Sequence, residues 1–460
     1  MNLLDRLRLN VEQRGEQDAL VTDQGPTSYR QLLGHVEEEM ARLKSAGLGP
    51  GKVVGLTIAD EVRHMVTALA LLCLETHHVT LASFDTDEAR ADLEARCGVD
   101  AVVELRGIFP VARRDNLVAA GGGLYLRTSG TTGRPSIVAV SFDQLVAQAK
   151  ANRGYDSHRL LCLASVEHNN AKRHRLYTLL SGGTNVFRAP RDAKLVEFCQ
   201  RFGVTCLDIA PIHAAGLVAT LDGRPLDSVM VRVSSTLVPP ALRAELYSRV
   251  TRQVSVRYGA TECGTIAVTE NDEPFSKSVG HPVVGASIQI FGPEGHSLPP
   301  GQSGEIRVRA DGMASGYLGD PQLTALRFRD GWFHTGDVGH LGKGGALVVE
   351  GRRDDMMILN GINIFPAEIE EMLERYPAVR SAAAAALRSS THGDIPVAIV
   401  ELHDADGATG AELLEFARQH LALRAPRRIV IVPEIPRNAQ GKVLRQRVLD
   451  TFAQGSQKHE

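Results

Sequence analysis

Short apolar runs alternate with amphipathic segments along the first 260 residues of the chain. The run at residues 53–58 has the length and composition of a buried strand. The segment after Ser28 carries apolar side chains at helical spacing as far as Leu43, and Ser28 and Gln31 have the spacing of a capping box at its start. Such alternation is typical of βαβ units around a mostly parallel sheet.

The alternation occurs in two series, so we expect two stacked α/β subdomains. The predicted strands lie at residues 53–58, 79–81, 101–103, 124–126, 137–140, 160–163, 185–187, 204–207, 229–233 and 254–257. From about residue 282 the pattern changes to short alternating strands joined by Gly and Pro turns. This change favours an antiparallel or barrel-like subdomain.

A charged segment at residues 351–355 marks the start of a smaller unit. The pattern after it predicts helices from Pro366 and at residues 411–421, and strands at residues 397–400 and 429–432. A size of about 100 residues suits a separate domain. We therefore expect an α/β fold, with a large N-terminal domain at residues 1–351 and a small, mobile α+β lid domain at residues 352–460.

The composition narrows the class of function. The 460 residues carry a formal net charge of -3 at pH 7, so no basic field favours nucleic acid as the main partner. No run of about 18 apolar residues occurs, and the N-terminus lacks the pattern of a signal peptide. The six cysteines include no C-x-x-C pair, which argues against a zinc site and a disulfide framework. We expect a cytoplasmic protein without a membrane partner.

Hydroxyl groups and glycines gather at residues 128–136, which contain three Thr, two Ser and two Gly. The segment lies between two predicted strands, where its backbone N–H groups and hydroxyls could cradle a phosphate. The spacing of Gly130 and Gly133, with a strand after them, is not that of a Walker A loop. Taken alone, the segment is also compatible with an ordinary turn, which is the commoner case.

Four clusters later in the sequence support a phosphate-binding role for residues 128–136. Tyr258-Gly259-Ala260-Thr261-Glu262 follows a predicted strand, where loops of α/β sheets commonly bind ligands. The segment at residues 331–337 ends in Asp337, a carboxylate suited to a ribose diol, and Arg352 and Lys442 add two cations. Each cluster alone is weak evidence, because short motifs are often ordinary turns or surface charges.

In this order, the five segments resemble those of the acyl-adenylate-forming superfamily, which includes acyl-CoA and aryl-CoA ligases, peptide-synthetase adenylation domains and luciferases. The resemblance spans about the whole chain, and the motif style is closest to the acyl- and aryl-CoA ligases. It implies an enzyme that activates a carboxylic acid with ATP and Mg²⁺, releases pyrophosphate and transfers the acyl group to CoA.

The resemblance also implies roles for individual residues. Lys442, Thr261 and Glu262 would be catalytic, with Glu262 as the Mg²⁺ ligand, and Asp354 would be the hinge between the domains. The residues implied to bind ATP or AMP are Thr128, Ser129, Gly130, Thr131, Thr132, Gly133, Ser235, Thr236, Tyr258, Gly259, Ala260, Asp337 and Arg352.

Two departures from the family pattern bear on the nucleotide site. The phosphate loop ends in Ser136 where the family usually has Lys, so one phosphate-directed cation is missing, although Arg134 could partly replace it. Residues 233–237 replace a Gly-Gly-Ala-Pro-like segment, and the added side chains should narrow the neighbouring pocket.

The implied acid pocket is polar. Its residues are His168, Asn169, Asp208, Ser234, Gly259 and Gly264. A polar wall disfavours a long acyl chain, because buried unpaired amides cost free energy, so we expect a small aromatic or otherwise polar acid. The four cations at residues 172–175 fit a solvated helix face, and a clamp for a substrate carboxylate is the less common alternative.

The acceptor is indicated by residues 361–370, which resemble the G-x-N-I-[YF]-P-x-E pattern of CoA ligases. We therefore expect CoA. The alternatives are a stand-alone adenylation enzyme that loads the phosphopantetheine of a carrier protein or acylates an amine, and a degraded relative that only binds a nucleotide or acyl ligand. The sequence predicts no oligomeric state.

Overall fold

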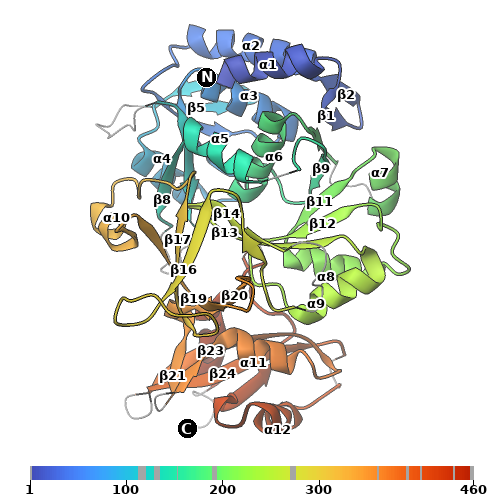
Figure 1. Ribbon diagram of the computed structural model, residues 1–460, viewed down its shortest axis with the longest axis vertical. Helices are drawn as coiled ribbons and strands as arrows, with labels where there is room; N and C mark the ends of the chain where they lie inside the picture. Colours follow the sequence, from blue (N-terminus) through green and yellow to red (C-terminus); the bar gives the residue numbers. More distant parts are fainter. Residues whose placement is uncertain are drawn as a thin grey trace. The chain divides into compact units, whose positions relative to one another are not determined.

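The computed structural model describes residues 3–111, 121–128, 135–152, 154–188, 194–269, 276–359, 362–389, 393–404, 407–438 and 441–455 (Figure 1). Contacts divide the chain into two compact units. The first comprises Met1–Ser235, Pro240–Ile288 and Arg307–Thr335, and the second comprises Thr236–Pro239, Gln289–Ile306 and Gly336–Glu460. The domain boundary expected between residues 351 and 352 stays a prediction.

A six-stranded sheet forms part of the first unit. Its strand order is β6-β5-β3-β4-β7-β8, and β3 is parallel to β4 and β5, while β4 is parallel to β7. The strands are β3 (Val53–Thr57), β4 (His77–Thr80), β5 (Ala101–Glu104), β6 (Gly107–Pro110), β7 (Gly123–Arg127) and β8 (Ile137–Ser141). The helices of this part are α1 (Leu3–Arg14), α2 (Tyr29–Ser45), α3 (Glu61–Cys73) and α4 (Asp87–Cys97). The capping box predicted at Ser28 is confirmed, and α1, α2 and α3 pack against one another (Figure 1).

A nine-stranded sheet completes the α/β part of the first unit, in the order β15-β14-β13-β12-β11-β9-β10-β1-β2. The six strands from β13 to β1 in this order are parallel, which confirms the predicted βαβ series. The strands are β1 (Asp18–Thr22), β2 (Gly25–Ser28), β9 (Arg159–Cys162), β10 (Thr184–Val186), β11 (Cys206–Ile209), β12 (Met230–Val233), β13 (Val254–Ala260), β14 (Gly264–Val268) and β15 (His281–Pro282). The helices are α5 (Phe142–Ala151), α6 (Asn169–Ser181), α7 (Leu195–Arg201), α8 (Pro211–Thr220), α9 (Pro240–Glu245) and the π-helix η1 (Leu246–Val250).

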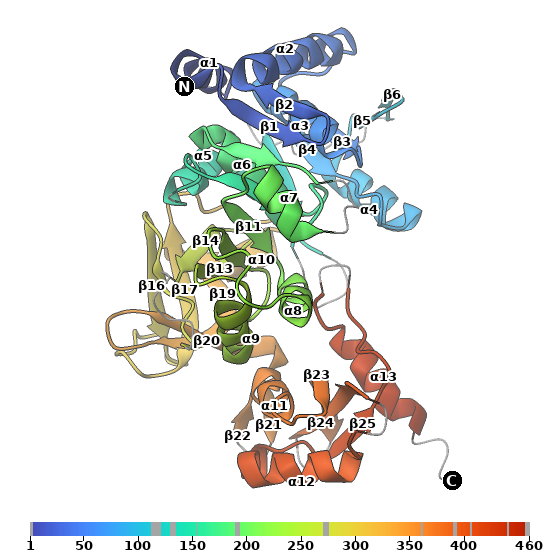
Figure 2. The ribbon, with the colours of Figure 1, turned by 90° about the vertical axis from the view of Figure 1, so that its right-hand side faces the viewer.

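Helix α6 is buried although it carries four consecutive basic residues, Lys172 to Arg175. It lies beside α5 in both views (Figure 1, Figure 2) and contacts β9 and β10. All ten residues from Ala171 to Leu180 are buried, including Lys172 (2% exposed) and Arg175 (2% exposed). The prediction of a solvated helix face was therefore wrong, because each of these four basic side chains bonds to an element that lies far away in the sequence.

Antiparallel strands follow residue 282, as predicted. The sheet has the order β16-β17-β19-β18, with β20 paired to β19, and β19 is antiparallel to β18 and β20. Its elements are β16 (Ala286–Phe291), β17 (Gly304–Ala310), α10 (Pro321–Arg327), β18 (Phe328–Arg329), β19 (Trp332–Leu341) and β20 (Leu347–Arg352). After them, the 3₁₀ helix η2 (Arg353–Asp355) precedes the last sheet.

The last sheet belongs to the second unit and has the order β22-β21-β24-β23, with β25 paired to β24. Its elements are β21 (Met357–Leu359), β22 (Ile362–Ile364), α11 (Pro366–Leu373), β23 (Val379–Ser389), β24 (Gly393–Leu402), α12 (Gly410–Leu421), η3 (Ala422–Arg424), β25 (Arg428–Ile431) and α13 (Arg445–Gly455). Alternate residues of β23 and β24 join different cores, one with α11 and α12 and the other with α13. Within the part of the chain that the structure describes, no helix is both long enough and apolar enough to span a bilayer.

Candidate active site

The base of the predicted phosphate loop is a short antiparallel ladder. β7 and β8 pair up to Arg127 and Ile137, and beyond them the backbone N–H of Thr128 donates to the carbonyl of Ser136 at 2.8 Å. The backbone N–H of Ser136 donates to Oγ1 of Thr128 at 3.2 Å. The two strands predicted around the loop are therefore confirmed, whereas Ser129, Gly130, Thr131, Thr132, Gly133 and Arg134 lie outside the described residues.

The segment that was predicted to bind ATP or AMP at residues 258–260 lies inside a strand. Tyr258, Gly259 and Ala260 belong to β13 and pair with β14, and a turn at residues 261–263 joins the two strands. A Cβ at Gly259 would lie 2.5 Å from the carbonyl oxygen of Gly264, so the close approach of the two strands requires glycine there. The chain thus turns sharply at Thr261 and Glu262.

Two side chains from distant segments hold this turn. Tyr317 donates its hydroxyl to Oε1 of Glu262 at 2.6 Å, and Glu262 is only 8% exposed. Nη1 of Arg173 donates to the carbonyl oxygen of Thr261 at 3.0 Å. The backbone N–H of Ala314 also donates to the carbonyl of Glu262 at 2.8 Å. No local sequence motif marks Tyr317, and Arg173 was noted only as one of the basic residues at positions 172–175.

The carboxylate of Glu262 is suited to bind a magnesium ion. Among the described residues, no group of three or more His, Cys, Asp and Glu side chains could enclose a metal ion. Mg²⁺ usually keeps several waters and binds one or two carboxylates together with substrate phosphates. A single carboxylate that is oriented by a tyrosine hydroxyl fits this pattern.

Several residues of the predicted acid pocket lie together at the start of α6. The amide of Asn169 donates to the carbonyl of Arg127, next to the phosphate loop, at 2.8 Å. The amide of Asn170 donates to Oγ of Ser234 at 3.1 Å. His168 stacks on Phe84, which is 46% exposed, with ring centroids 4.8 Å apart. The structure therefore places His168, Asn169 and Ser234 in one region, and their role in an acid pocket stays a prediction.

Asp208, another residue of the predicted acid pocket, is buried and pairs with His174. Its Oδ2 lies 2.5 Å from Nδ1 of His174, and Asp208 is 6% exposed. Burial alone would raise the pKa of Asp208, but His174, Arg257 and Arg232 together hold this pKa below its usual value. The guanidinium groups of Arg232 and Arg257 lie 4.8 and 5.3 Å from the ring centroid of Tyr155. Gly264, at the other edge of the predicted pocket, faces the side chain of Gln148 and has a φ of +76°.

Ser235 has a backbone conformation that favours glycine. Its φ is +89°, a value that side chains with a Cβ adopt only under strain. Ser235 is exposed and Thr236 partly exposed, and both lie shortly after β12, in the segment at residues 233–237 that replaces a Gly-Gly-Ala-Pro-like segment of the family. The strain is therefore localised at the segment that replaces the family's small residues.

The second unit carries the other predicted nucleotide residues. Asp337 and Arg352 are paired on β19 and β20, and Nη1 of Arg352 lies 3.2 Å from Oδ1 of Asp337. Asp354, the predicted hinge, lies in η2, and its Oδ2 is 3.5 Å from Nη2 of Arg352. These three charged residues form one network within the unit.

Lys442 lies within electrostatic reach of the same network. Burial lowers its pKa, Asp355 and Asp337 counteract this effect, and Arg352 and Arg445 add to it. The backbone of Lys442 is fixed by Asn438, whose Oδ1 accepts from the N–H of Lys442 at 3.0 Å. Lys442, Asp337 and Arg352 thus influence one another electrostatically within the second unit, and their roles in the nucleotide site stay predictions.

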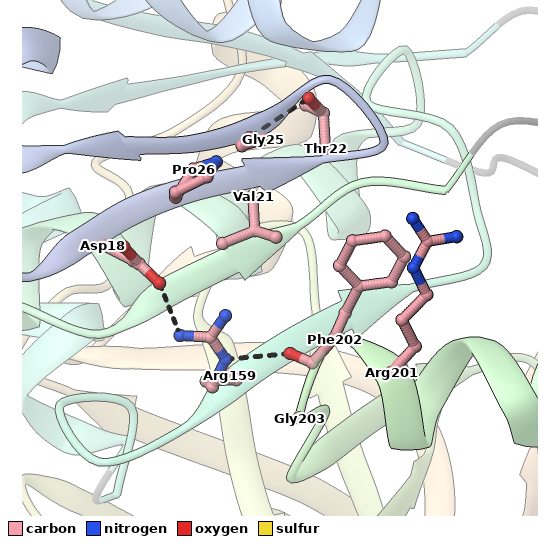
Figure 3. A pocket seen from close by; sticks show the side chains of 9 residues that line it. All are labelled: Asp18, Val21, Thr22, Gly25, Pro26, Arg159, Arg201, Phe202 and Gly203. Carbon is pink, nitrogen blue, oxygen red and sulfur yellow. Dashed lines mark hydrogen bonds and ion pairs between the residues drawn. The ribbon is translucent and has the colours of Figure 1, made fainter.

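An open pocket elsewhere in the first unit does not coincide with these residues. Its volume is about 380 Å³, and Figure 3 labels the nine residues that line it. One of them, Arg159, binds Asp18 at 2.9 Å through Nη1 and the carbonyl of Phe202 at 3.0 Å through Nε (Figure 3). None of the nine is a candidate active-site residue, so this pocket is separate from the predicted acid pocket.

Comparisons with known proteins agree with this arrangement. The model of the AMP-binding enzyme family matches residues 124–318, and the model of the AMP-binding enzyme C-terminal domain matches residues 368–442. Indoleacetate–CoA ligase of Aromatoleum aromaticum is 30% identical over 79% of this chain and 73% of its own length. 2-Succinylbenzoate–CoA ligase of Bacillus licheniformis is 28% identical over 96% of this chain and 98% of its own length.

The fold also matches solved structures. ATP-bound MatB from Rhodopseudomonas palustris superposes with a TM-score of 0.88, at 23% identity, over 98% of both chains. At this identity the structural similarity is evidence for the fold alone. Membership of a family is shown by the two family models and by the relative at 30% identity. The chain therefore belongs to the AMP-binding enzyme family, the acyl-adenylate-forming superfamily.

Proposed function

We propose that this chain is an AMP-forming acid–CoA ligase, which activates a carboxylic acid with ATP and then transfers the acyl group to CoA. The observation that carries the proposal is the turn after β13, where Tyr317 holds the carboxylate of Glu262 and Arg173 holds the backbone of Thr261. Two relatives of the same family are named as CoA ligases, for indoleacetate and for 2-succinylbenzoate.

In the first half-reaction, a carboxylate oxygen of the acid attacks the α-phosphorus of ATP and pyrophosphate leaves. The attack brings two anions together, so catalysis depends on positioning and on cations that face the phosphate. Lys442 provides such a charge, and Glu262 would hold Mg²⁺, which neutralises phosphate charge when it is bound. Asp337 accepts hydrogen bonds from the ribose hydroxyls, and Arg352 orients that carboxylate.

In the second half-reaction, the thiol sulfur of CoA attacks the acyl carbon of the adenylate and AMP leaves. The segment that favours CoA includes Asn363, an exposed residue of β22, and the start of α11 at Pro366. We infer that the acid is small and aromatic or otherwise polar, because the start of α6 carries the imidazole of His168 and the amides of Asn169 and Asn170.

The experiment is a panel of carboxylic acids incubated with the enzyme, ATP and Mg²⁺, with pyrophosphate release as the measurement. Active acids are then tested with CoA, with an amine and with a carrier protein, and the product is identified by mass spectrometry. We expect acid-dependent pyrophosphate release and a CoA thioester. Formation of an amide or a carrier-bound acyl group without any thioester would overturn CoA as the acceptor, and ATP binding without pyrophosphate release for any acid would overturn the ligase activity.

A further inference from the structure

Lys442 lies on a short hairpin of the second unit, directly before helix α13. The two arms of the hairpin meet at its base, where the backbone N–H of Leu444 donates to the carbonyl of Pro436 at 2.9 Å. We call this segment the lysine hairpin, and its described residues are 436–438 and 441–444. The next residue, Arg445, is the first of α13, so its anchoring fixes the end of the hairpin.

The guanidinium of Arg445 contacts three other elements of the second unit. Nη1 donates to Oε1 of Glu370 on α11 at 2.6 Å, and it also donates to the carbonyl of Ala384 on β23. Nε lies 3.6 Å from Oδ2 of Asp355 in η2, the residue after the predicted hinge. Arg445 therefore ties the lysine hairpin to α11, to the last sheet and to the hinge segment.

Glu370 is held in place for this contact. The backbone N–H of Ala384 donates to Oε1 of Glu370 at 2.9 Å, so this oxygen is already fixed to β23 when it accepts from Arg445. The side chains of Glu370 and Arg445 are only 17% and 29% exposed. Glu370 is the last residue of the segment at residues 361–370 that resembles CoA ligases. Its carboxylate nevertheless pairs with the end of the hairpin that carries Lys442.

The position of the ammonium of Lys442 depends on its backbone. A lysine side chain is a flexible four-carbon stem with a point charge at its end, so a displaced backbone displaces the charge. A displacement of about 1 Å can cost about 100-fold in rate when a reaction depends on precise geometry. Asp355 raises the pKa of Lys442 and Arg445 lowers it, so both groups also lie within electrostatic reach of the ammonium.

We propose that the Glu370–Arg445 pair positions Lys442 for the first half-reaction, so that Glu370 serves adenylate formation although it lies in the segment that resembles CoA ligases. The inference rests on the proposed ligase function and adds two positioning residues to it. Both act through Lys442, because their contacts fix the backbone from which its side chain projects.

The test measures the two half-reactions separately with an acid that is active in the panel. The first is followed by pyrophosphate release, and the second by thioester formation from the synthetic adenylate of the same acid and CoA. The second starts after pyrophosphate has left, so it needs no charge for the attack on the α-phosphorus. The variants are Arg445→Gln and Glu370→Gln, which keeps an acceptor for the N–H of Ala384 and should therefore fold. Arg447→Gln, a change of an exposed arginine of the same helix, is the control.

We expect kcat for pyrophosphate release to fall about 10- to 100-fold in Arg445→Gln and Glu370→Gln, with the Michaelis constant for ATP changed less than about 3-fold. Thioester formation should stay within about 2-fold of the wild-type rate, and Arg447→Gln should behave like the wild type in both assays. In the background of Lys442→Ala, Arg445→Gln should cost less than about 2-fold more, because residues that act through one group are not additive.

Three results would overturn the positioning role. Equal losses in both half-reactions, or an additive loss in the background of Lys442→Ala, would mean that the pair only stabilises the fold. Normal pyrophosphate release in both variants would separate the pair from Lys442, and a loss of thioester formation alone would assign Glu370 to the CoA step.

Hydrogen exchange separates this inference from the ligase proposal, because it needs no substrate. The backbone N–H groups of Lys442 and Leu444 are both hydrogen-bonded within the lysine hairpin. Their exchange should be at least about 10-fold faster in Arg445→Gln than in the wild type and in Arg447→Gln, even if no acid releases pyrophosphate. Exchange as slow as in the wild type would contradict the anchoring of the hairpin by Arg445 whatever the outcome of the activity assays.

Discussion

Asp337 and Arg352 face each other across two antiparallel strands, and the side chains form an ion pair with Nη1 and Oδ1 3.2 Å apart. Because β19 and β20 fix both backbones, the carboxylate of Asp337 is oriented before any ligand arrives. Preorganisation of this kind lowers the free-energy cost of binding. The pair is therefore suited to hold a ribose diol with one carboxylate.

Replacement of Asp337 by alanine should weaken ATP binding. A carboxylate that accepts from two hydroxyls makes charge-assisted hydrogen bonds of about 1.5–3 kcal/mol each, so we expect the Michaelis constant for ATP to rise about 10- to 100-fold. The constant for the acid should change less. Asp404→Ala, a change of an exposed residue of the same unit, is the control. An unchanged Michaelis constant for ATP in Asp337→Ala would show that this carboxylate does not bind the ribose.

Tyr317→Phe tests the orientation of Glu262. The change keeps the ring, which packs edge-on against Phe328, but removes the hydroxyl that donates to Oε1 of Glu262. Loss of a group that orients a metal ligand typically costs 10- to 100-fold in metal affinity, so the Mg²⁺ concentration for half-maximal pyrophosphate release should rise by about that factor. The control is Tyr376→Phe. A Mg²⁺ titration identical to that of the wild type would remove Tyr317 from the site.

Lys442→Ala should impair adenylate formation and leave the fold intact. The loss of one charge that stabilises the transition state costs about 3 kcal/mol, or about 100-fold in rate. Because the neighbouring backbone is held by Asn438, and not by the ammonium, the melting temperature should stay within a few degrees of the wild-type value. Lys343→Ala, a change of an exposed lysine, is the control. Unimpaired pyrophosphate release by a folded Lys442 variant would exclude it from the first half-reaction.

Much of the fold could be predicted from local patterns. Apolar runs mark the buried parallel strands, because a strand covered on both faces needs an almost continuous apolar sequence. The capping box at Ser28 marked the start of α2 correctly. Strand β23 could not be predicted in the same way, since its five consecutive alanines favour helix over strand. The two cores that flank this strand, one on each face, favour small side chains there.

The site was less predictable than the fold. Asp337, Arg352 and Glu262 could be proposed as site residues because they lie in short motifs whose order along the chain resembles that of the family. Tyr317 could not be found, because it reaches Glu262 across 55 residues without a local motif. The prediction that residues 172–175 form a solvated helix face failed for a related reason. These basic side chains are buried because they have partners on other elements, and helical spacing alone does not reveal those partners.

Ser235→Gly should relieve backbone strain. A non-glycine residue at a φ of +89° carries backbone strain of the order of 1–3 kcal/mol. Glycine removes this strain, but it also increases the conformational entropy of the unfolded state, which offsets part of the gain in stability. We therefore expect a net increase of about 1 kcal/mol in the free energy of unfolding, measured by urea denaturation. Ser234→Gly is the matched control at a position without a positive φ. Lower stability of Ser235→Gly than of the wild type would show that the side chain of Ser235 stabilises the segment more than its strain destabilises it.

The stability of the protein should depend on pH through Lys172. Burial lowers the pKa of this lysine to about 7, from 10.5 in its ordinary state, although Glu167 counteracts the shift. Between these two pH values the unfolded state holds a proton that the folded state has lost, so the free energy of unfolding rises with pH across this window. The contribution amounts to about 1.4 kcal/mol per pH unit at most. Below pH 7 both states are protonated, and the cost of the buried ammonium is fully present.

Lys172→Met isolates this contribution, because it removes the titrating group and leaves the neighbouring histidines in place. His64 and His78 face Lys172 from α3 and β4, and burial lowers the pKa of both, so their titration affects stability mainly below pH 6.5. Urea denaturation at pH 7.5 and pH 9.5 should show a larger gain in the wild type than in Lys172→Met, by up to about 2–3 kcal/mol. Lys194→Met, a change of an exposed lysine, should show the wild-type gain. The free energy of unfolding could instead change equally with pH in the wild type and in Lys172→Met. The buried amine would then not titrate between pH 7.5 and 9.5, which would mean that the folded protein stabilises its charged form.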